Sequence, residues 1–255
     1  MRIRDHSDGT WEKIARSDPY YGVLTSDRFR SGQLNDDSMA EFFRSGEEHI
    51  AYTIATAEKH LSCHIGNERA LDFGCGAGRL VIPMGRRFGD VVGVDISSAY
   101  RSLAEENCTK HEVSNVRLVA SLDEIGAEVG TFDFVHSYLV FLHIPVRRGL
   151  RITRGLVELL KPGGVGALHF LYHRDIGALR RALNTTRKYF LPLHWVLNAV
   201  SSRSPFELMM QANDYPLNRL FLALRELGVV GLYVEQMQVD EDHHAFLYFR
   251  KSPAS

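Results

Sequence analysis

An acidic residue and three glycines at fixed spacing are the residues of this chain best placed to bind a ligand: Asp72, Gly74, Gly76 and Gly78. They read as the end of a strand, a turn and the start of a helix. Glycine is needed where the backbone bends at positive φ or approaches a ligand closely, because a Cβ would collide there. A helix start also presents free N–H groups to a polar or anionic ligand. The segment therefore predicts a ligand-binding turn.

The spacing of the glycines distinguishes between classes of ligand. A dinucleotide-binding turn has the pattern G-x-G-x-x-G. Here Arg79 occupies the place of its third glycine, and Gly78 comes one residue early. The pattern present, D-x-G-x-G-x-G, resembles motif I of the class I S-adenosylmethionine (SAM)-dependent methyltransferases. This resemblance implies that SAM is the cofactor.

Three further segments resemble motifs of the same family, in the family's order. The apolar run from Asp90 ends at Asp95, and a carboxylate at the end of the second strand accepts hydrogen bonds from ribose hydroxyls in nucleotide-binding folds. Phe132–Ser137 resembles the fourth strand, and Leu159–Gly164 resembles the helix stop before the fifth. Together the motifs cover about residues 68–170.

The resemblance also implies which residues contact the cofactor: Asp72, Gly74, Gly76, Gly78, Asp95, Ile96, Asp123 and Glu47. Asp72 either orients the glycine turn or touches the amino-acid end of SAM. Leu122 stands where the family usually has an acid, so the adenine is held by Asp123, one residue late, or by backbone alone. Glu47 belongs to a helix that folds over the cofactor, or it only complements the positive end of that helix.

Two histidines are candidates for a general base. Methyl transfer from a sulfonium mainly requires alignment and exclusion of water, but a hydroxyl nucleophile also benefits from a base with a pKa close to the working pH. His143 follows strand four, where the family places substrate-facing residues, and His169 lies at the end of strand five. The alternative for His143 is a structural role, capping the helix near Pro145 or packing on the sheet.

The elements around these residues alternate between strand and helix. Strands are expected near residues 69–73, 91–95, 116–119, 132–138 and 164–170, and helices near 79–88, 98–110 and 146–160. This alternation predicts an α/β fold with a doubly wound, mostly parallel sheet. Two β-rich runs, 229–239 and 244–250, follow. The resemblance makes them strands six and seven of a seven-stranded sheet with the order 3-2-1-4-5-7-6.

The parts outside the core suggest a division of the chain. Residues 1–62 are expected to form an N-terminal helical lid, and residues 63–255 the SAM-binding methyltransferase domain. Residues 171–216 are too long for an ordinary connection and are expected to form a helical substrate cap. In the lid, Ser38 and Ser45 each begin a capping-box pattern. These two patterns are equally compatible with two helices that meet at Gly46 and with one bent helix.

Composition limits the partners. The net charge of −1 over 255 residues gives no electrostatic reason to expect nucleic acid or an anionic membrane. There is no apolar run near 18 residues and no signal-peptide pattern at the N-terminus. Three cysteines without paired spacing predict reduced thiols and a cytoplasmic location. No zinc-binding spacing is present, and the sequence leaves a homodimer open.

The sequence therefore predicts a methyltransferase that transfers a methyl group from SAM to the hydroxyl of a small molecule such as a sugar, a phenol or a polyketide-type alcohol. His136-Ser137 replaces the acid of the metal-dependent catechol-type enzymes, so no metal is expected. The alternatives are methylation of an amine, a non-catalytic SAM-binding protein, and methylation of tRNA or protein. The last would use a basic patch of four residues: Arg180, Arg181, Arg187 and Lys188.

Overall fold

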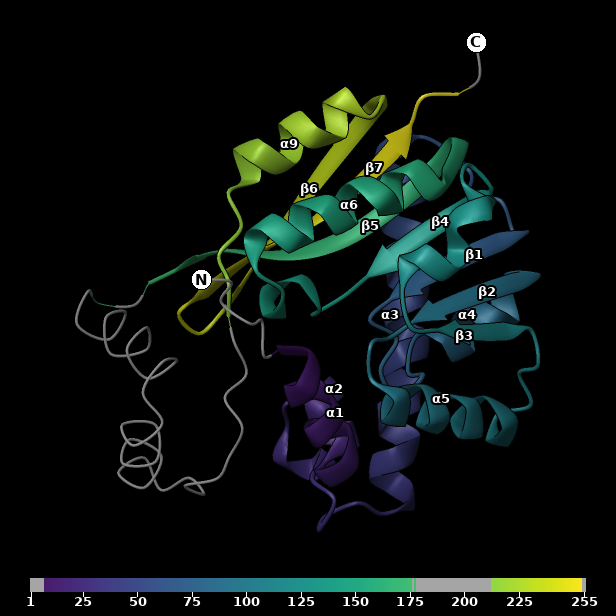
Figure 1. Cartoon of the computed structure of the whole chain (residues 1–255), viewed down its shortest axis with the longest axis vertical. Helices are drawn as coiled ribbons and strands as arrows, with labels where there is room; N and C mark the ends of the chain where they lie inside the picture. Colours follow the sequence, from purple (N-terminus) through teal and green to yellow (C-terminus); the bar gives the residue numbers. More distant parts are fainter. Residues whose placement is uncertain (1–6, 176, 178–211, 254–255) are drawn as a thin grey trace.

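The computed structural model describes residues 7–175, 177 and 212–253 of the chain. Its centre is one seven-stranded sheet with the order β3-β2-β1-β4-β5-β7-β6, which confirms the predicted fold class and strand order (Figure 1). β7 is antiparallel to both β5 and β6, and the other pairs are parallel. The strands are β1 (Arg69–Phe73), β2 (Asp90–Val94), β3 (Val116–Val119), β4 (Phe132–Ser137), β5 (Leu160–Arg174), β6 (Val229–Val239) and β7 (Asp242–Lys251).

Helices cover both faces of the sheet, as the alternating pattern predicts. One face packs against α3 (Asp36–Leu61), α4 (Val81–Arg87) and α5 (Ser98–Lys110), and the other against α6 (Val146–Leu159) and α9 (Leu217–Glu226). Figure 1 shows α6 and α9 in front of the sheet and α3 behind it. The short elements are α1 (Ser7–Ser17), α2 (Pro19–Val23), η1 (Asp27–Phe29), η2 (Leu122–Glu128) and η3 (Phe141–His143). No helix in the described part of the chain is long and apolar enough to cross a membrane.

A single unbroken helix, α3, spans the segment around Gly46, for which the sequence was compatible with either two helices or one bent helix. Asn35 is its N-cap: the Asn35 carboxamide oxygen accepts from the Ser38 N–H at 2.8 Å, and the Ser38 hydroxyl accepts from the Asn35 N–H at 3.0 Å. Ser45 caps nothing, because its hydroxyl donates to the Phe42 carbonyl at 2.7 Å. Gly46 lies inside this helix, and the position requires glycine because a Cβ there would lie 2.1 Å from the Arg79 carbonyl oxygen.

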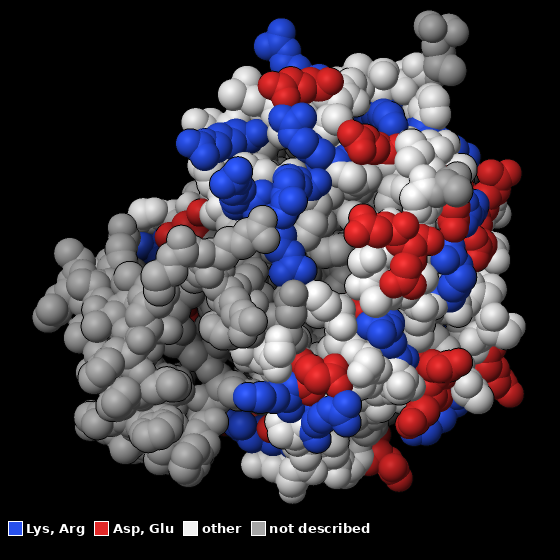
Figure 2. Space-filling view, in the orientation of Figure 1, with Lys and Arg blue, Asp and Glu red and all other residues white. Residues whose placement is uncertain are grey.

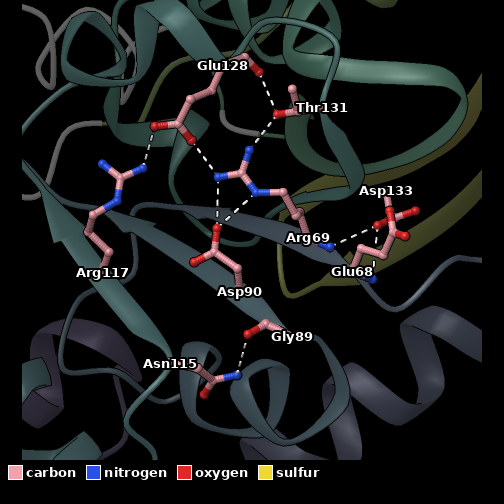
Figure 3. A network of polar contacts seen from close by, with 9 residues as sticks. All are labelled: Glu68, Arg69, Gly89, Asp90, Asn115, Arg117, Glu128, Thr131 and Asp133. Atoms are coloured by element: carbon pink, nitrogen blue, oxygen red, sulfur yellow. Dashed lines mark hydrogen bonds and ion pairs between the residues drawn. The ribbon is translucent and has the colours of Figure 1, made fainter.

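A polar network ties together the amino ends of the first strands (Figure 3). Arg69, the first residue of β1, donates to the Asp90 carboxylate at 2.8 Å and to the Thr131 hydroxyl at 2.7 Å, and it also pairs with Glu128. Arg117 of β3 donates to the same Glu128 at 2.6 Å. Ligands of such sheets bind at the opposite, carboxyl ends of the strands. This network therefore supports the scaffold and not the site.

Residues 171–174, which the sequence assigns to the cap, belong instead to β5, which continues to Arg174 and pairs there with β7. Residues 178–211, with the four basic residues of the alternative hypothesis, lie outside the described residues. Where the chain is described again, the Asn213 N–H donates to the Leu142 carbonyl and the Tyr215 hydroxyl to the Ile144 carbonyl, both at 2.8 Å. The segment thus returns beside the loop that carries His143, and the cap itself stays a prediction.

Candidate active site

A cleft of 460 Å³ lies at the carboxyl ends of β1, β2 and β4. Six of the residues predicted from the sequence line it: Gly74, Gly76, Asp95, Ile96, Asp123 and His143. A volume of this size is within the range of small-ligand and cofactor pockets. The site therefore forms where open α/β sheets bind their ligands.

The floor of the cleft is the glycine turn. Gly74, Gly76 and Gly78 have φ angles of +82°, +51° and +89°, which residues other than glycine rarely adopt. The N–H groups of Gly74 and Cys75 donate to the Val94 carbonyl at 2.7 and 3.0 Å, so the turn is fixed to the end of β2. A Cβ on Gly74 would lie 2.2 Å from Val140. Glycine is required here by backbone conformation and by close packing together.

Asp95 faces the cleft at the end of β2. Its carboxylate accepts hydrogen bonds from the Gly76 and Ser97 N–H groups, each at 2.9 Å, and so joins the glycine turn to the start of α5. Burial raises the pKa of this carboxyl to about 6, although the two N–H groups oppose the shift. Each carboxylate oxygen has a second lone pair, which leaves Asp95 able to accept from the hydroxyls of a ribose.

The N-terminal helices form one wall of the cleft through Trp11, Gly22 and Val23. They are held there by polar contacts to α5: the Ser97 hydroxyl donates to Glu12 at 2.7 Å, and the Tyr100 hydroxyl donates to the Pro19 carbonyl at 2.9 Å. The opposite rim includes Arg148 and Arg151 of α6. Figure 2 shows lysine and arginine side chains gathered over α6 and α9, a distribution that favours anionic ligands near this rim.

The two candidate bases occupy different environments. His143 is half-buried in η3, lines the cleft and packs edge-on against Trp11, with 4.8 Å between ring centroids. His169 is only 1% exposed and is stacked on His244 behind Tyr138. Burial, followed by neighbouring histidines, lowers the pKa of His169 to about 3. Of the two, only His143 is among the residues that line the cleft.

Residues 70–164 match the methyltransferase domain family. Ubiquinone biosynthesis O-methyltransferase of Acinetobacter baylyi is 30% identical over 102 residues, which are 39% of this chain and 42% of that protein. Magnesium protoporphyrin IX methyltransferase of Synechocystis PCC 6803, crystallised with bound S-adenosylhomocysteine (SAH), shares the fold with a TM-score of 0.59 and 19% identity over 98% of both chains. Residues 70–164 thus match the methyltransferase domain family, and the described chain has the fold of a SAM-dependent methyltransferase of known structure.

The match to the curated relative spans less than half of that protein, so its name does not fix the reaction of this chain. Fold alone does not fix it either. The [4+2]-cyclase SpnF has the same fold, with a TM-score of 0.56 and 15% identity over 79% of this chain and 80% of that one. The reaction has to be argued from the residues of the cleft.

Three of the predicted cofactor contacts do not line the cleft. Glu47 is exposed on α3 and pairs with Arg86 of α4. Asp72 points to the α3 side of the sheet, where its carboxylate accepts from His136 Nδ1 at 2.8 Å. Gly78, which the cleft does not reach, allows close packing instead, because a Cβ there would lie 3.3 Å from Ala104 of α5.

A chain of three polar side chains beside the cleft was not predicted. Asp72 holds His136, and His136 Nε2 lies 3.0 Å from Nε2 of His49 on α3. Burial lowers the pKa of His49 to about 2, with a contribution from His136. Asp72 and His136 are opposite each other in the β1–β4 pairing. The predicted strand order makes β1 and β4 neighbours, so a register argument could have found this pair, but no sequence signal joins it to His49.

Proposed function

We propose that this protein transfers a methyl group from SAM to the hydroxyl of a small molecule, without a metal, with His143 as general base. The observation that carries the proposal is that the glycine turn, Asp95 and His143 all face one cleft. These three features have separate tasks in the reaction. The turn and Asp95 bind the cofactor, and His143 takes the proton of the acceptor.

The residues of the cleft fit SAM. The Gly74–Gly78 turn leaves room for a ligand beside backbone, and Asp95 offers a carboxylate to the ribose hydroxyls. Ile96, Leu122 and Asp123 surround the adjoining part of the cleft, where the adenine would be held. SAM supplies the methyl group on a sulfonium. The aromatic wall of Trp11 helps to exclude water from the reacting atoms.

His143 has the chemistry that an oxygen acceptor needs. As the oxygen–methyl bond forms and the sulfur–methyl bond breaks, the hydroxyl proton has to leave, and the imidazole of His143 accepts it. The positive charge of the sulfonium thereby ends on the imidazolium, and SAH leaves as a neutral thioether. His169 is the second candidate, although it is 1% exposed and its ring packs against that of Tyr138.

A small-molecule acceptor is supported by two independent observations. The curated relative is named as an O-methyltransferase of ubiquinone biosynthesis, whose acceptor is a small molecule. The chain also returns at Asn213–Tyr215 beside the His143 loop, a position that is compatible with a cap over an acceptor formed by the residues between β5 and Asn213. We further propose that the protein works in the cytoplasm, and we leave its oligomeric state to measurement.

The test is incubation of the purified protein with SAM and a panel of phenols, sugars, amines and unmodified tRNA, followed by mass spectrometry of products and measurement of SAH. A methylated hydroxyl is the expected product. Methylation of the amine or tRNA alone would replace the proposed acceptor, and SAM binding without SAH release on any acceptor would favour a non-catalytic protein.

His143→Ala then tests the base. A positioned general base contributes about 10²- to 10⁴-fold, so kcat should fall by that factor while the Kd for SAM stays unchanged. Only the unprotonated imidazole can accept a proton, so the parent rate should fall in acid while the variant's loses that dependence. His169→Ala is the matched comparison. Full activity and an unchanged pH profile in His143→Ala would make His143 structural.

A further inference from the structure

Basic side chains line the part of the cleft that α6 provides. Lysine and arginine side chains gather over α6 and α9 on this side of the molecule (Figure 2). Four residues of α6 line the cleft, and their spacing along the helix places them on one face: Arg148, Arg151, Ile152 and Gly155. The helix therefore presents two cations to whatever the cleft binds.

Arg151 carries a charge that no carboxylate of the described chain neutralises. It is exposed, and within the described part of the chain it forms neither an ion pair nor a hydrogen bond. Arg154, almost one turn further along α6, is by contrast paired with Glu226 of α9 at 2.5 Å. Asp95 and Asp123 also line the cleft, but neither forms an ion pair with Arg151. The guanidinium of Arg151 is therefore available to an anionic ligand.

Arg148 is the second cation, and it lies nearer to the proposed base. It precedes Arg151 by almost one turn of α6 and follows His143 by five residues. Burial raises the pKa of the Tyr215 phenol, and the charge of Arg148 opposes that rise, so the two side chains are close. The same phenol donates to the Ile144 carbonyl, directly after His143. One continuous segment thus carries the base and both cations.

The direction of α6 places its arginines on the acceptor side of the cleft. At the far end of the cleft-facing stripe, a Cβ on Gly155 would lie 3.4 Å from Leu122, beside the part of the cleft assigned to the adenine. The arginines precede Gly155 in the helix, and helical side chains lean towards the N-terminus. Arg151 therefore leans away from the adenine end and towards η3, which carries His143.

We propose that the acceptor is an anion, whose carboxylate or phosphate group binds Arg151 with Arg148 beside it while its hydroxyl faces His143. This inference rests on the proposed function, because it assumes SAM in the cleft and His143 as the base. A guanidinium donates paired N–H groups that match the oxygens of a carboxylate or a phosphate. A neutral acceptor would leave the charge of Arg151 unanswered.

The first measurement is binding to the SAH-loaded protein, which needs neither the natural acceptor nor turnover. The probes are benzoate, phenyl phosphate and benzamide, which carry a carboxylate, a phosphate and a neutral amide on the same ring. Their dissociation constants can be measured by NMR titration. Charged hydrogen bonds change affinity by about ten- to a hundredfold. The parent should prefer at least one anion to benzamide by that factor, and the preferred anion identifies the acidic group.

Arg151→Met should abolish the preference for the anion and leave the Kd values of benzamide and SAH unchanged. Arg151→Lys should retain part of the preference, because it keeps the charge but not the paired donors. Arg148→Met should also weaken the anions. Arg154→Met is the matched control, since it removes an arginine of the same helix that does not line the cleft, and it should bind all probes as the parent does.

The second measurement extends the acceptor panel with pairs of hydroxyl compounds that differ only in an anionic or a neutral group. The anionic member of each pair should have the higher kcat/KM. Arg151→Met should raise KM for the anions by about ten- to a hundredfold with little change in kcat. His143→Ala should lower kcat instead, so the two variants separate binding of the anion from removal of the proton.

The outcomes that overturn this inference differ from those that overturn the proposed function. If the SAH-loaded parent binds neither anion better than benzamide, the anion subsite is refuted while the cofactor assignment stands. A preference that persists in Arg151→Met would refute it as well, and a loss of SAH affinity in that variant would make Arg151 a cofactor contact. Failure of the parent to bind SAH would refute the proposed function itself.

Discussion

The affinity of the cleft for a ribose should depend on pH through Asp95. Burial raises the pKa of this carboxyl to about 6 in the free protein. Ribose hydroxyls donate more strongly to the ionised carboxylate than to the protonated carboxyl, so a bound ligand lowers that pKa. Binding therefore releases protons just below pH ~6, and the affinity should fall there, by no more than about tenfold for each pH unit, and level off above it.

The size of the contact can be estimated from its geometry. Both carboxylate oxygens of Asp95 already accept one N–H at 2.9 Å, so the ribose gains hydrogen bonds to a charged group that is held rigidly in place. Removing such bonds costs about 1–3 kcal/mol. Asp95→Ala should accordingly weaken binding by about 5- to 150-fold at pH ~8, and its affinity should no longer fall with acid.

Folding stability should show the opposite trend. The pKa of Asp95 is higher in the folded protein than the unfolded value of ~3.9, so the folded state holds the proton more tightly. Binding of this proton therefore raises the free energy of unfolding by its full amount below pH ~4, and this stabilisation is lost as the pH rises through about 6. Because the side chain keeps partial contact with solvent, the loss should be about 1–2 kcal/mol relative to Asp95→Asn.

The assay is titration with 5′-methylthioadenosine, which has the ribose but neither charge of the amino-acid end, from about pH 5 to about pH 8. Urea unfolding of the parent and Asp95→Asn over the same range measures the stability term. A dissociation constant that does not change with pH in the parent would refute the assignment of the ribose to Asp95. So would an acid-dependent loss of affinity that persists unchanged in Asp95→Ala.

Two further predictions concern the scaffold. Gly46→Ala should destabilise the protein by about 1–3 kcal/mol in urea unfolding, because its Cβ would lie 2.1 Å from the Arg79 carbonyl, whereas Gly126→Ala, with nothing within 4 Å, should change stability far less. Arg69→Met should lower the free energy of unfolding by about 1–2 kcal/mol without changing SAM affinity, since its partners Asp90 and Glu128 lie at the amino ends of the strands. A loss of SAM affinity in Arg69→Met that remains when only the folded protein is counted would show that the two ends of the sheet are coupled.

The strands and the glycine turn could be predicted because their determinants are local. Residues 116–119 and 98–110 form a strand and a helix with the bounds expected from the sequence. The positive φ angles of Gly74 and Gly78 follow from the same spacing that identified the turn. Hydrophobic periodicity and glycine placement act over a few residues, so they are visible in a single sequence.

The continuity of α3 could not be predicted for the opposite reason. Gly46 and the capping-box pattern at Ser45 are local signals for a break, and the sequence therefore left two helices open. The helix continues because Gly46 serves a distant contact, the packing of α3 on the backbone of Arg79. A glycine that allows close approach and a glycine that ends a helix look identical until the partner is known.

The side chain of Asp72 shows the same limit beside the active site. Asp72 was assigned to the cofactor by its place in the motif, but the motif does not say which way its side chain points. The structure turns it towards α3, where one of its carboxylate oxygens accepts a hydrogen bond from His136. Arg79 looks like a departure from a glycine pattern in the sequence, and only the structure shows that its side chain is buried, 4% exposed. A motif names the residue at each position, but the direction and the partners of its side chain depend on packing between elements that lie far apart in the sequence.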